Sequence, residues 1–278
     1  MKPNNFILNG FDRSGTSAIS RTLASHPDIE IIMQPFNSGN IRQRLYQIID
    51  DDNTTDADYN FFKKLEQGTL ETSYISSEWH YNYSSVKEFV NKKLHLIKTT
   101  QNHLTIAWVK QHFPGVEHWG IWREPMDILA SLVRNNFHNE WYSGAVTELI
   151  ETVKNNELLD AHFSEFIELL NNPIREMAFI IAVRSWFYFY YLESNKIIYY
   201  SEFVKNNTNA LKPILHYFYL APFDFNKSNK KDLNIIGQKY QVGRKYLDCI
   251  PKTDLESCTK IFRPLESLVL GNNYDKTV

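Results

Sequence analysis

A glycine-containing turn near the N-terminus carries the residues best suited to chemistry. An apolar run at residues 6–8 leads into the segment 10–17, and a helical pattern with Ile19 and Leu23 on one face follows it. Strand, glycine loop and helix is the arrangement that points backbone N–H groups and the positive end of a helix at an anion. The sequence therefore predicts an anion-binding loop.

This loop departs from a nucleotide-triphosphate loop at one decisive place. Gly10, Gly15 and Ser17 fit the pattern G-x-x-x-x-G-K-[ST], but Thr16 stands where the lysine belongs. Kinases and ATPases use that lysine on the β- and γ-phosphates, beside a magnesium ion. Its absence argues against a triphosphate ligand, and Arg13 inside the loop is the expected replacement cation.

A second informative stretch spans residues 122–134. Arg123 is predicted to end a strand, and Ser131 lies eight residues further on, about two turns along the next helix. An arginine at a strand end and a hydroxyl on the following helix can hold a second phosphate. Taken alone, the stretch could equally be a helix with a solvated arginine, and Asp127 could simply stabilise the helix N-terminus.

Together the two stretches resemble the sulfotransferases that use 3′-phosphoadenosine 5′-phosphosulfate (PAPS). The run Arg13-Ser14-Gly15-Thr16-Ser17 is similar to that family's 5′-phosphosulfate loop, and Arg123 and Ser131 match the arginine and serine that bind its 3′-phosphate. Two weaker similarities follow at residues 199–204 and 242–245. In the last of these, the residues implied to reach the 3′-phosphate are Gly243, Arg244 and Lys245.

The resemblance implies transfer of a sulfonate from PAPS to a hydroxyl, or less readily an amine, of a small molecule, glycan or lipid, without a metal. The product would be 3′,5′-adenosine bisphosphate (PAP). A sulfonate carries less charge than a γ-phosphoryl group, so N–H groups, hydroxyls and one cation can stabilise its in-line transfer. We expect Arg13 to neutralise charge on the bridging oxygen. The amides of Ser14 to Ser17 and the hydroxyls of Thr16 and Ser17 are expected to hold the phosphate.

The general base is where the sequence departs from the family. Many members carry a glutamate after the second strand, but here Gln34 stands there, and an amide cannot take a proton. Gln34 could still orient the acceptor. His103, after the third predicted strand, is the first candidate base, and Lys98 is a candidate contact for the sulfonate. Glu78 and His80 are the next candidates, and the expected acceptor contacts are completed by Phe36 and Trp141.

Length and composition limit the possible fold, partners and location of the protein. A chain of 278 residues with 43% hydrophobic residues can form one large α/β domain, 1–278, and a net charge of −2 gives no broad basic face for nucleic acid. Cys249 and Cys258 fit no metal or disulfide pattern. The first residues leave no room for a signal peptide, and the most apolar segment, 178–192, is too short for a bilayer and contains Arg184. A cytoplasmic protein is expected.

The order of elements predicts the fold. Strands are expected at residues 6–8, 29–33, 95–98, 116–122 and 196–200, with helices between them at 41–49, 104–113, 126–135, 178–192, 203–220 (broken at Pro213) and 253–271. An acidic loop is expected at 50–58 and a helical insertion or lid at 136–175. This βα order predicts a three-layer, P-loop-like α/β fold around a mostly parallel sheet. The loops at 10–17, 34–39, 98–103 and 123–131 should then share the ligand-binding edge.

Three other functions remain open on the sequence alone. One is a P-loop kinase, against which the missing loop lysine weighs. Another is a nucleotide-binding protein without catalysis, a hypothesis that Gln34 keeps open. The third is a structural or interaction module with no nucleotide affinity.

Overall fold

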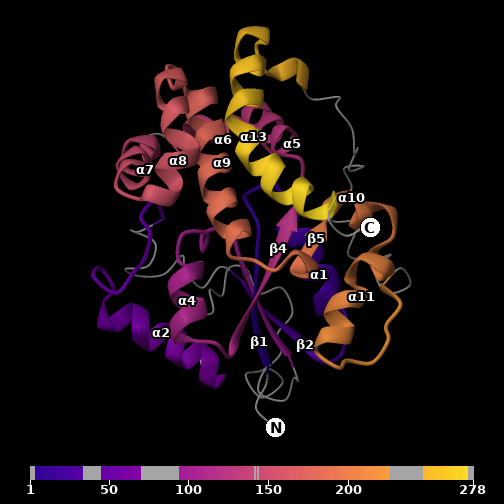
Figure 1. Ribbon diagram of the computed structural model, residues 1–278. Helices are drawn as coiled ribbons and strands as arrows, with labels where there is room; N and C mark the ends of the chain where they lie inside the picture. Colours follow the sequence, from indigo (N-terminus) through magenta and orange to yellow (C-terminus); the bar gives the residue numbers. More distant parts are fainter. Residues whose placement is uncertain are drawn as a thin grey trace.

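A five-stranded parallel sheet forms the centre of the protein (Figure 1). The computed structural model describes residues 4–33, 45–69, 94–140, 142, 144–225 and 247–274. The strands, in sheet order, are β2 (Ile29–Met33), β3 (Leu94–Thr99), β1 (Asn4–Asn9), β4 (Val116–Trp122) and β5 (Ile197–Tyr199). Every pair is parallel, which confirms the predicted sheet and all five predicted strands.

Helices cover both faces of this sheet, which confirms the three-layer α/β fold. Strand residues alternate between two cores: Phe6 and Leu8 of β1 face one, and Ile7 faces the other. Such strands, buried on both sides, are typical of parallel sheets. The first face packs against α1 (Thr16–Ala24), α10 (Tyr200–Lys205) and α11 (Asn207–Tyr217). The second packs against α2 (Asp56–Gln67), α4 (Ile106–His112) and α9 (Pro173–Tyr190).

The strand order places a crevice at the end of β1. The chain reaches β3 on one side of β1 and then crosses to β4 on the other side. Asn9, the last residue of β1, is in register with Thr99 of β3 and Gly120 of β4. Parallel α/β proteins bind ligands where neighbouring strands lead off in opposite directions, at their carboxyl ends. The loop after β1 therefore occupies the favoured position for a ligand site.

A layer of helices extends beyond the carboxyl edge of the sheet. It consists of α5 (Pro125–Arg134), α6 (Phe137–Glu140), α7 (Ala145–Lys154), α8 (Glu157–Phe163), the 3-10 helix η4 (Ser164–Leu169) and α13 (Lys252–Tyr274) around α9 (Figure 1). Every residue of α9 from Met177 to Phe189 is buried, as expected for a core helix. That the segment 136–175 acts as a lid stays a prediction.

Three local predictions are wrong. Residues 45–49 form a turn and an extended segment rather than a helix; the rest of that predicted helix, 41–44, lies outside the described residues. The acidic loop ends early because Thr55 and Asp58 form a reciprocal capping box that starts α2. Pro213 lies inside α11; the break falls at Asn206, whose side chain caps α11 by accepting the Asn209 amide at 3.0 Å.

Among the described residues, no helix is both long and apolar enough to cross a membrane.

Candidate anion-binding site

The loop between β1 and α1 has the backbone of an anion cradle. The Ser14 amide donates to the Phe11 carbonyl at 2.9 Å, and both Arg13 (φ 70°) and Gly15 (φ 99°) adopt the left-handed region. Such a conformation is uncommon for a residue with a side chain and tends to occur at functional sites. Gly15 caps α1 without any side-chain acceptor, so the first N–H groups of that helix are not taken by a cap.

Tyr200 explains why position 15 is glycine. A Cβ on Gly15 would lie 2.3 Å from Cε2 of the Tyr200 ring, and the same ring lies under the guanidinium of Arg123, 5.0 Å from ring centroid to Cζ. The first residue of α10 thus supports the loop after β1 and the end of β4 at once.

Replacing Gly15 by alanine is expected to destabilise the protein and distort the anion-binding backbone of the loop, since the side chain adds left-handed strain and a clash with Tyr200. Gly144→Ala is the matched control, because Gly144 also has a positive φ, 80°, but a Cβ added there would meet nothing within 4 Å. It should cost only about 1–2 kcal/mol of backbone strain. Urea unfolding of both variants measures the difference; equal losses would show that the Tyr200 contact does not constrain the loop.

The two motif stretches meet in space although they are far apart in sequence. Nη1 of Arg123 donates to the Arg13 carbonyl at 2.7 Å, and Nε of Arg13 donates to Oγ of Ser131 at 3.1 Å across a separation of 118 residues. The Arg13 guanidinium also lies 5.7 Å from the ring centroid of Phe137. Arg123 and Ser131 therefore flank the loop, and three polar side chains capable of binding anions converge there.

Two polar atoms in this group lack a partner. Oγ of Ser14 and Nε of Arg123 are buried and make no hydrogen bond with the described residues. Buried polar atoms are nearly always bonded in native proteins, so an orphaned hydroxyl and guanidinium N–H at one place indicate a ligand that would satisfy them. A phosphate oxygen accepts from both donor types. The residues present thus fit a phosphorylated ligand.

Lys98 adds a buried cation at the end of β3. Its side chain is 4% exposed, and it is in register with Leu8 of β1 and Met33 of β2. Burial lowers the pKa of Lys98 to about 8, a shift that the Asp12 carboxylate opposes and Arg21 reinforces. The ammonium form still dominates at neutral pH, so Lys98 can contribute positive charge to the same edge.

The structure argues against His103 as the general base. His103 is buried, and Nη2 of Arg184 lies 3.1 Å from its Nδ1 while also donating to the Thr100 carbonyl at 2.9 Å. A guanidinium only donates, so Nδ1 must accept and the ring proton sits on Nε2. No lone pair is then left for the proton of an acceptor. Burial, reinforced by Arg184, holds the pKa of His103 well below its usual range.

Sequence reasoning missed one polar pair at this edge. The hydroxyl of Tyr142 donates to Oδ2 of Asp12, the residue that precedes Arg13. The sequence feature that could have indicated this pair is Asp12 itself, an acid inside a loop expected to bind an anion. The remaining candidates lie outside the described residues: Gln34, Phe36, Glu78, His80, Trp141, Gly243, Arg244 and Lys245. Within the described residues, no group of three or more His, Cys, Asp and Glu side chains could hold a metal ion.

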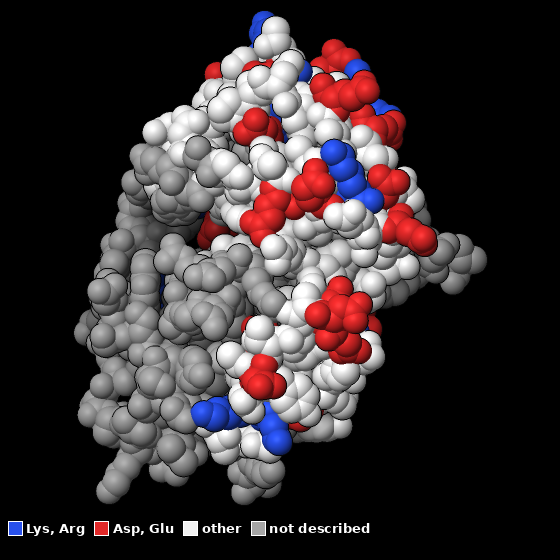
Figure 2. All heavy atoms as spheres, turned by 90° about the vertical axis from the view of Figure 1, so that its left-hand side faces the viewer, with Lys and Arg blue, Asp and Glu red and all other residues white. Residues whose placement is uncertain are grey.

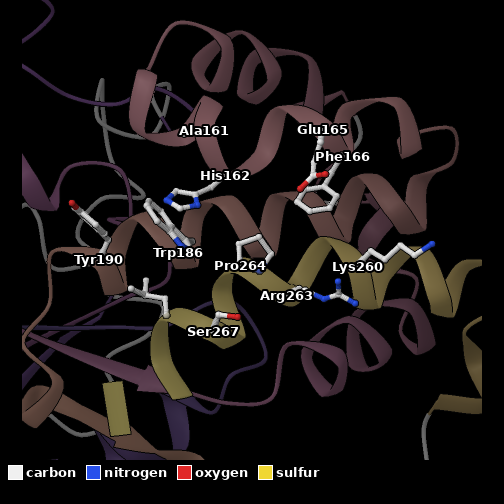
Figure 3. A pocket seen from close by; sticks show the side chains of 11 residues that line it. Ala161, His162, Glu165, Phe166, Trp186, Tyr190, Lys260, Arg263, Pro264 and Ser267 are labelled. Atoms are coloured by element: carbon white, nitrogen blue, oxygen red, sulfur yellow. The ribbon is translucent and has the colours of Figure 1, made fainter. Parts of the chain in front are cut away.

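A sizeable cavity on the described surface lies elsewhere. It encloses about 690 Å³ between α8, α9 and α13, on the side of α9 that carries Trp186 and Tyr190 (Figure 3). Arg184, two residues before Trp186, instead bonds to the turn after β3. The cavity and the loop are thus on different sides of α9, and the converging donors of the loop are the better candidate for chemistry.

The charge on the neighbouring surface is of the opposite sign. Figure 2 shows acidic side chains gathered over the helical layer that contains α7 and α8. The exposed or partly exposed acids of these helices and η4 are Glu148, Glu151, Glu157, Asp160, Glu165 and Glu168. Positive charge is instead concentrated locally, at Arg13, Arg123 and Lys98.

Fold and loop together define a P-loop-like α/β protein with a candidate anion site after β1. The model of the sulfotransferase family matches residues 5–224, and the chain belongs to that family. A sulfotransferase from Alicyclobacillus acidocaldarius superposes with a TM-score of 0.47 at 13% identity, over 97% of this chain and 96% of that one. Sulfotransferase STF9 from Mycobacterium avium gives a TM-score of 0.51 at 14% identity, over 96% of this chain and 77% of that one. The latter likeness supports the fold. No curated protein sequence matches this one.

Proposed function

We propose that the protein transfers a sulfonate group from PAPS to a hydroxyl, or less readily an amine, of a small-molecule, glycan or lipid acceptor. The observation that carries this proposal is the convergence of Arg13, Arg123 and Ser131 on a loop with left-handed Arg13 and Gly15. This cluster provides adjacent positions for two phosphate groups. A nucleotide with a 3′-phosphate and a 5′-phosphate requires such a pair of positions.

We assign each residue a proposed role that its position supports. Amides at the start of α1 and the hydroxyls of Ser14, Thr16 and Ser17 hold the 5′-phosphate, because they lie at the helix N-terminus. Arg123 and Ser131 hold the 3′-phosphate. PAPS, when bound, supplies the sulfonate and a phosphate leaving group. Arg13 and Lys98 stabilise the charge that develops as transfer proceeds. The family resemblance adds Gly243, Arg244 and Lys245 to the proposed 3′-phosphate contacts, and these residues lie outside the described residues.

The nucleotide preference is the first test. PAP should raise the melting temperature by several degrees at saturating concentration, because a ligand that binds only the folded state stabilises it. ATP with magnesium should not, since the loop has Thr16 where the lysine of a triphosphate loop belongs. Thermal unfolding with each nucleotide separates the alternatives. Stabilisation by ATP and not PAP would favour a kinase, and no response to either would favour an interaction module.

Catalysis is tested separately from binding. The protein is incubated with [³⁵S]PAPS and a panel of alcohols, phenols, saccharides and amines, and labelled products are separated by chromatography. Transfer to a member of the panel supports the enzyme. Binding of PAP with no sulfate released to any acceptor, water included, would identify a nucleotide-binding protein without catalysis.

A further inference from the structure

Asp12 is a carboxylate at the ligand edge that has no role in nucleotide binding. It lies between Phe11, which is buried, and Arg13, which is exposed, and is itself partly exposed. A negative charge next to a site for anions is unfavourable, so its presence calls for a reason. Its only hydrogen-bonding partner among the described residues is the hydroxyl of Tyr142.

Tyr142 is held rigidly as a donor. It is 7% exposed and stacks on Phe11 with 5.8 Å between ring centroids and 24° between ring planes. Burial, followed by the Asp12 charge, raises the pKa of Tyr142 well above its usual range. The phenol therefore keeps its proton and orients one oxygen of Asp12, while Oδ1 has no partner among the described residues.

Lys98 supplies the compensating charge. It is buried at the end of the neighbouring strand, and Asp12 is the charge that favours its ammonium form. One oxygen of this carboxylate accepts from a phenol, and the other has no hydrogen-bonding partner within the part of the chain that the structure describes. That second oxygen is therefore available to take a proton from an acceptor.

We propose that Asp12 is the general base that takes the proton of the acceptor hydroxyl, an inference that rests on the proposed function. The acceptor oxygen forms a new bond to sulfur as the bond between sulfur and the bridging oxygen breaks, and that electron pair stays on the departing 5′-phosphate. The hydroxyl proton passes to Oδ1 of Asp12. Tyr142 positions the carboxylate, and Lys98 supplies positive charge at the same edge of the sheet. His103, whose Nδ1 already accepts from Arg184, and Gln34, an amide, cannot fill this role.

The inference predicts a specific kinetic signature. Asp12→Asn keeps an oxygen for Tyr142 but cannot take a proton, so it should lower the rate of sulfonate transfer at neutral pH by about 100- to 10,000-fold. PAP affinity should be unchanged or tighter, because the variant loses a negative charge beside the anion site. Asp160→Asn on α8 is the matched control and should behave as wild type.

The probe is [³⁵S]PAPS with water as the acceptor, so that no knowledge of the natural acceptor is needed. Sulfate release is measured at neutral pH for wild type, Asp12→Asn, Asp12→Glu and Tyr142→Phe. Asp12→Glu should recover part of the rate. Tyr142→Phe should lower the rate less than Asp12→Asn does, because the carboxylate remains and loses only the hydrogen bond that orients it.

A second readout does not depend on turnover. Titration of ¹³C-labelled lysine side chains by NMR should give a pKa of about 8 for Lys98 in the wild type and a lower value in Asp12→Asn, since the Asp12 carboxylate raises it. A folded Asp12→Asn protein that keeps the wild-type rate would overturn the proposal. Sulfate release by neither protein, with PAP bound by both, would refute the catalytic part of the proposed function and the role of Asp12 with it, and would leave nucleotide binding intact. Failure of the wild type to bind PAP would instead refute the proposed function.

Discussion

Arg13→Ala is expected to lower the rate of sulfonate transfer by about 100- to 1000-fold, the cost of removing one preorganised group that stabilises developing charge. Arg13 is exposed in the loop, and its Nε donates to the hydroxyl of Ser131. The side chain can therefore move from that hydroxyl to the ligand. The backbone strain should be unaltered, because alanine tolerates the observed φ of 70° no better than arginine does. Measuring both PAPS turnover and PAP affinity for the variant distinguishes a loss of catalysis from a loss of binding.

Two further variants belong to this experiment: Arg13→Lys tests partial rescue, and Arg263→Ala is the control. Lysine retains the charge without the planar fork, so it should recover part of the rate. Arg263 lies on α13 and lines the outer cavity, and its loss should leave turnover unchanged. Activity of Arg13→Ala within about threefold of the wild type would exclude Arg13 from a charge-stabilising role of the expected size.

Acid should destabilise the protein steeply between about pH 6.5 and about pH 3. His118 is completely buried, and burial, reinforced by Lys110 and Lys196, lowers its pKa to about 3. Both His118 and His103 stay neutral in the folded state while the unfolded chain takes up protons below about pH 6.5. The free energy of unfolding is therefore highest above about pH 6.5. Below that pH it falls by about 1.4 kcal/mol per pH unit for each of the two histidines. His118 alone lowers the free energy of unfolding by about 5 kcal/mol between about pH 6.5 and about pH 3. This loss is comparable to the total free energy of unfolding of a marginally stable domain.

Urea unfolding at a series of pH values measures this loss. His118→Phe removes one titrating group and should flatten the dependence by about one proton per molecule, even if its stability at neutral pH is lower. His162→Gln is the control, because His162 is exposed beside Trp186. An unchanged pH dependence in His118→Phe would mean that His118 is not the buried neutral group that the fold indicates.

The sheet was predictable because its strands are short, mostly apolar stretches rich in β-branched residues, and the loop because its glycines and Arg13 have fixed spacing. The family resemblance also paired Arg123, at the end of β4, with Ser131, about two turns along the next helix. It could not assign the base. The tautomer of His103 depends on Arg184, and the orientation of Asp12 depends on Tyr142, 130 residues away. Such pairings arise from tertiary packing and leave no local pattern. The start of α2 at Thr55 was missed because the acids of its capping box are equally typical of a polar loop.

The contact of Tyr200 with Gly15 and Arg123 has a consequence for the order in which the molecule is made. The phosphate loop is local in sequence, yet its support comes from a ring nearly two-thirds of the chain away, so the site has a high contact order and forms late. During synthesis, the nascent chain has every residue of the loop long before it has Tyr200. The proposed nucleotide would therefore stabilise the chain only after β4, β5 and α10 have assembled around β1.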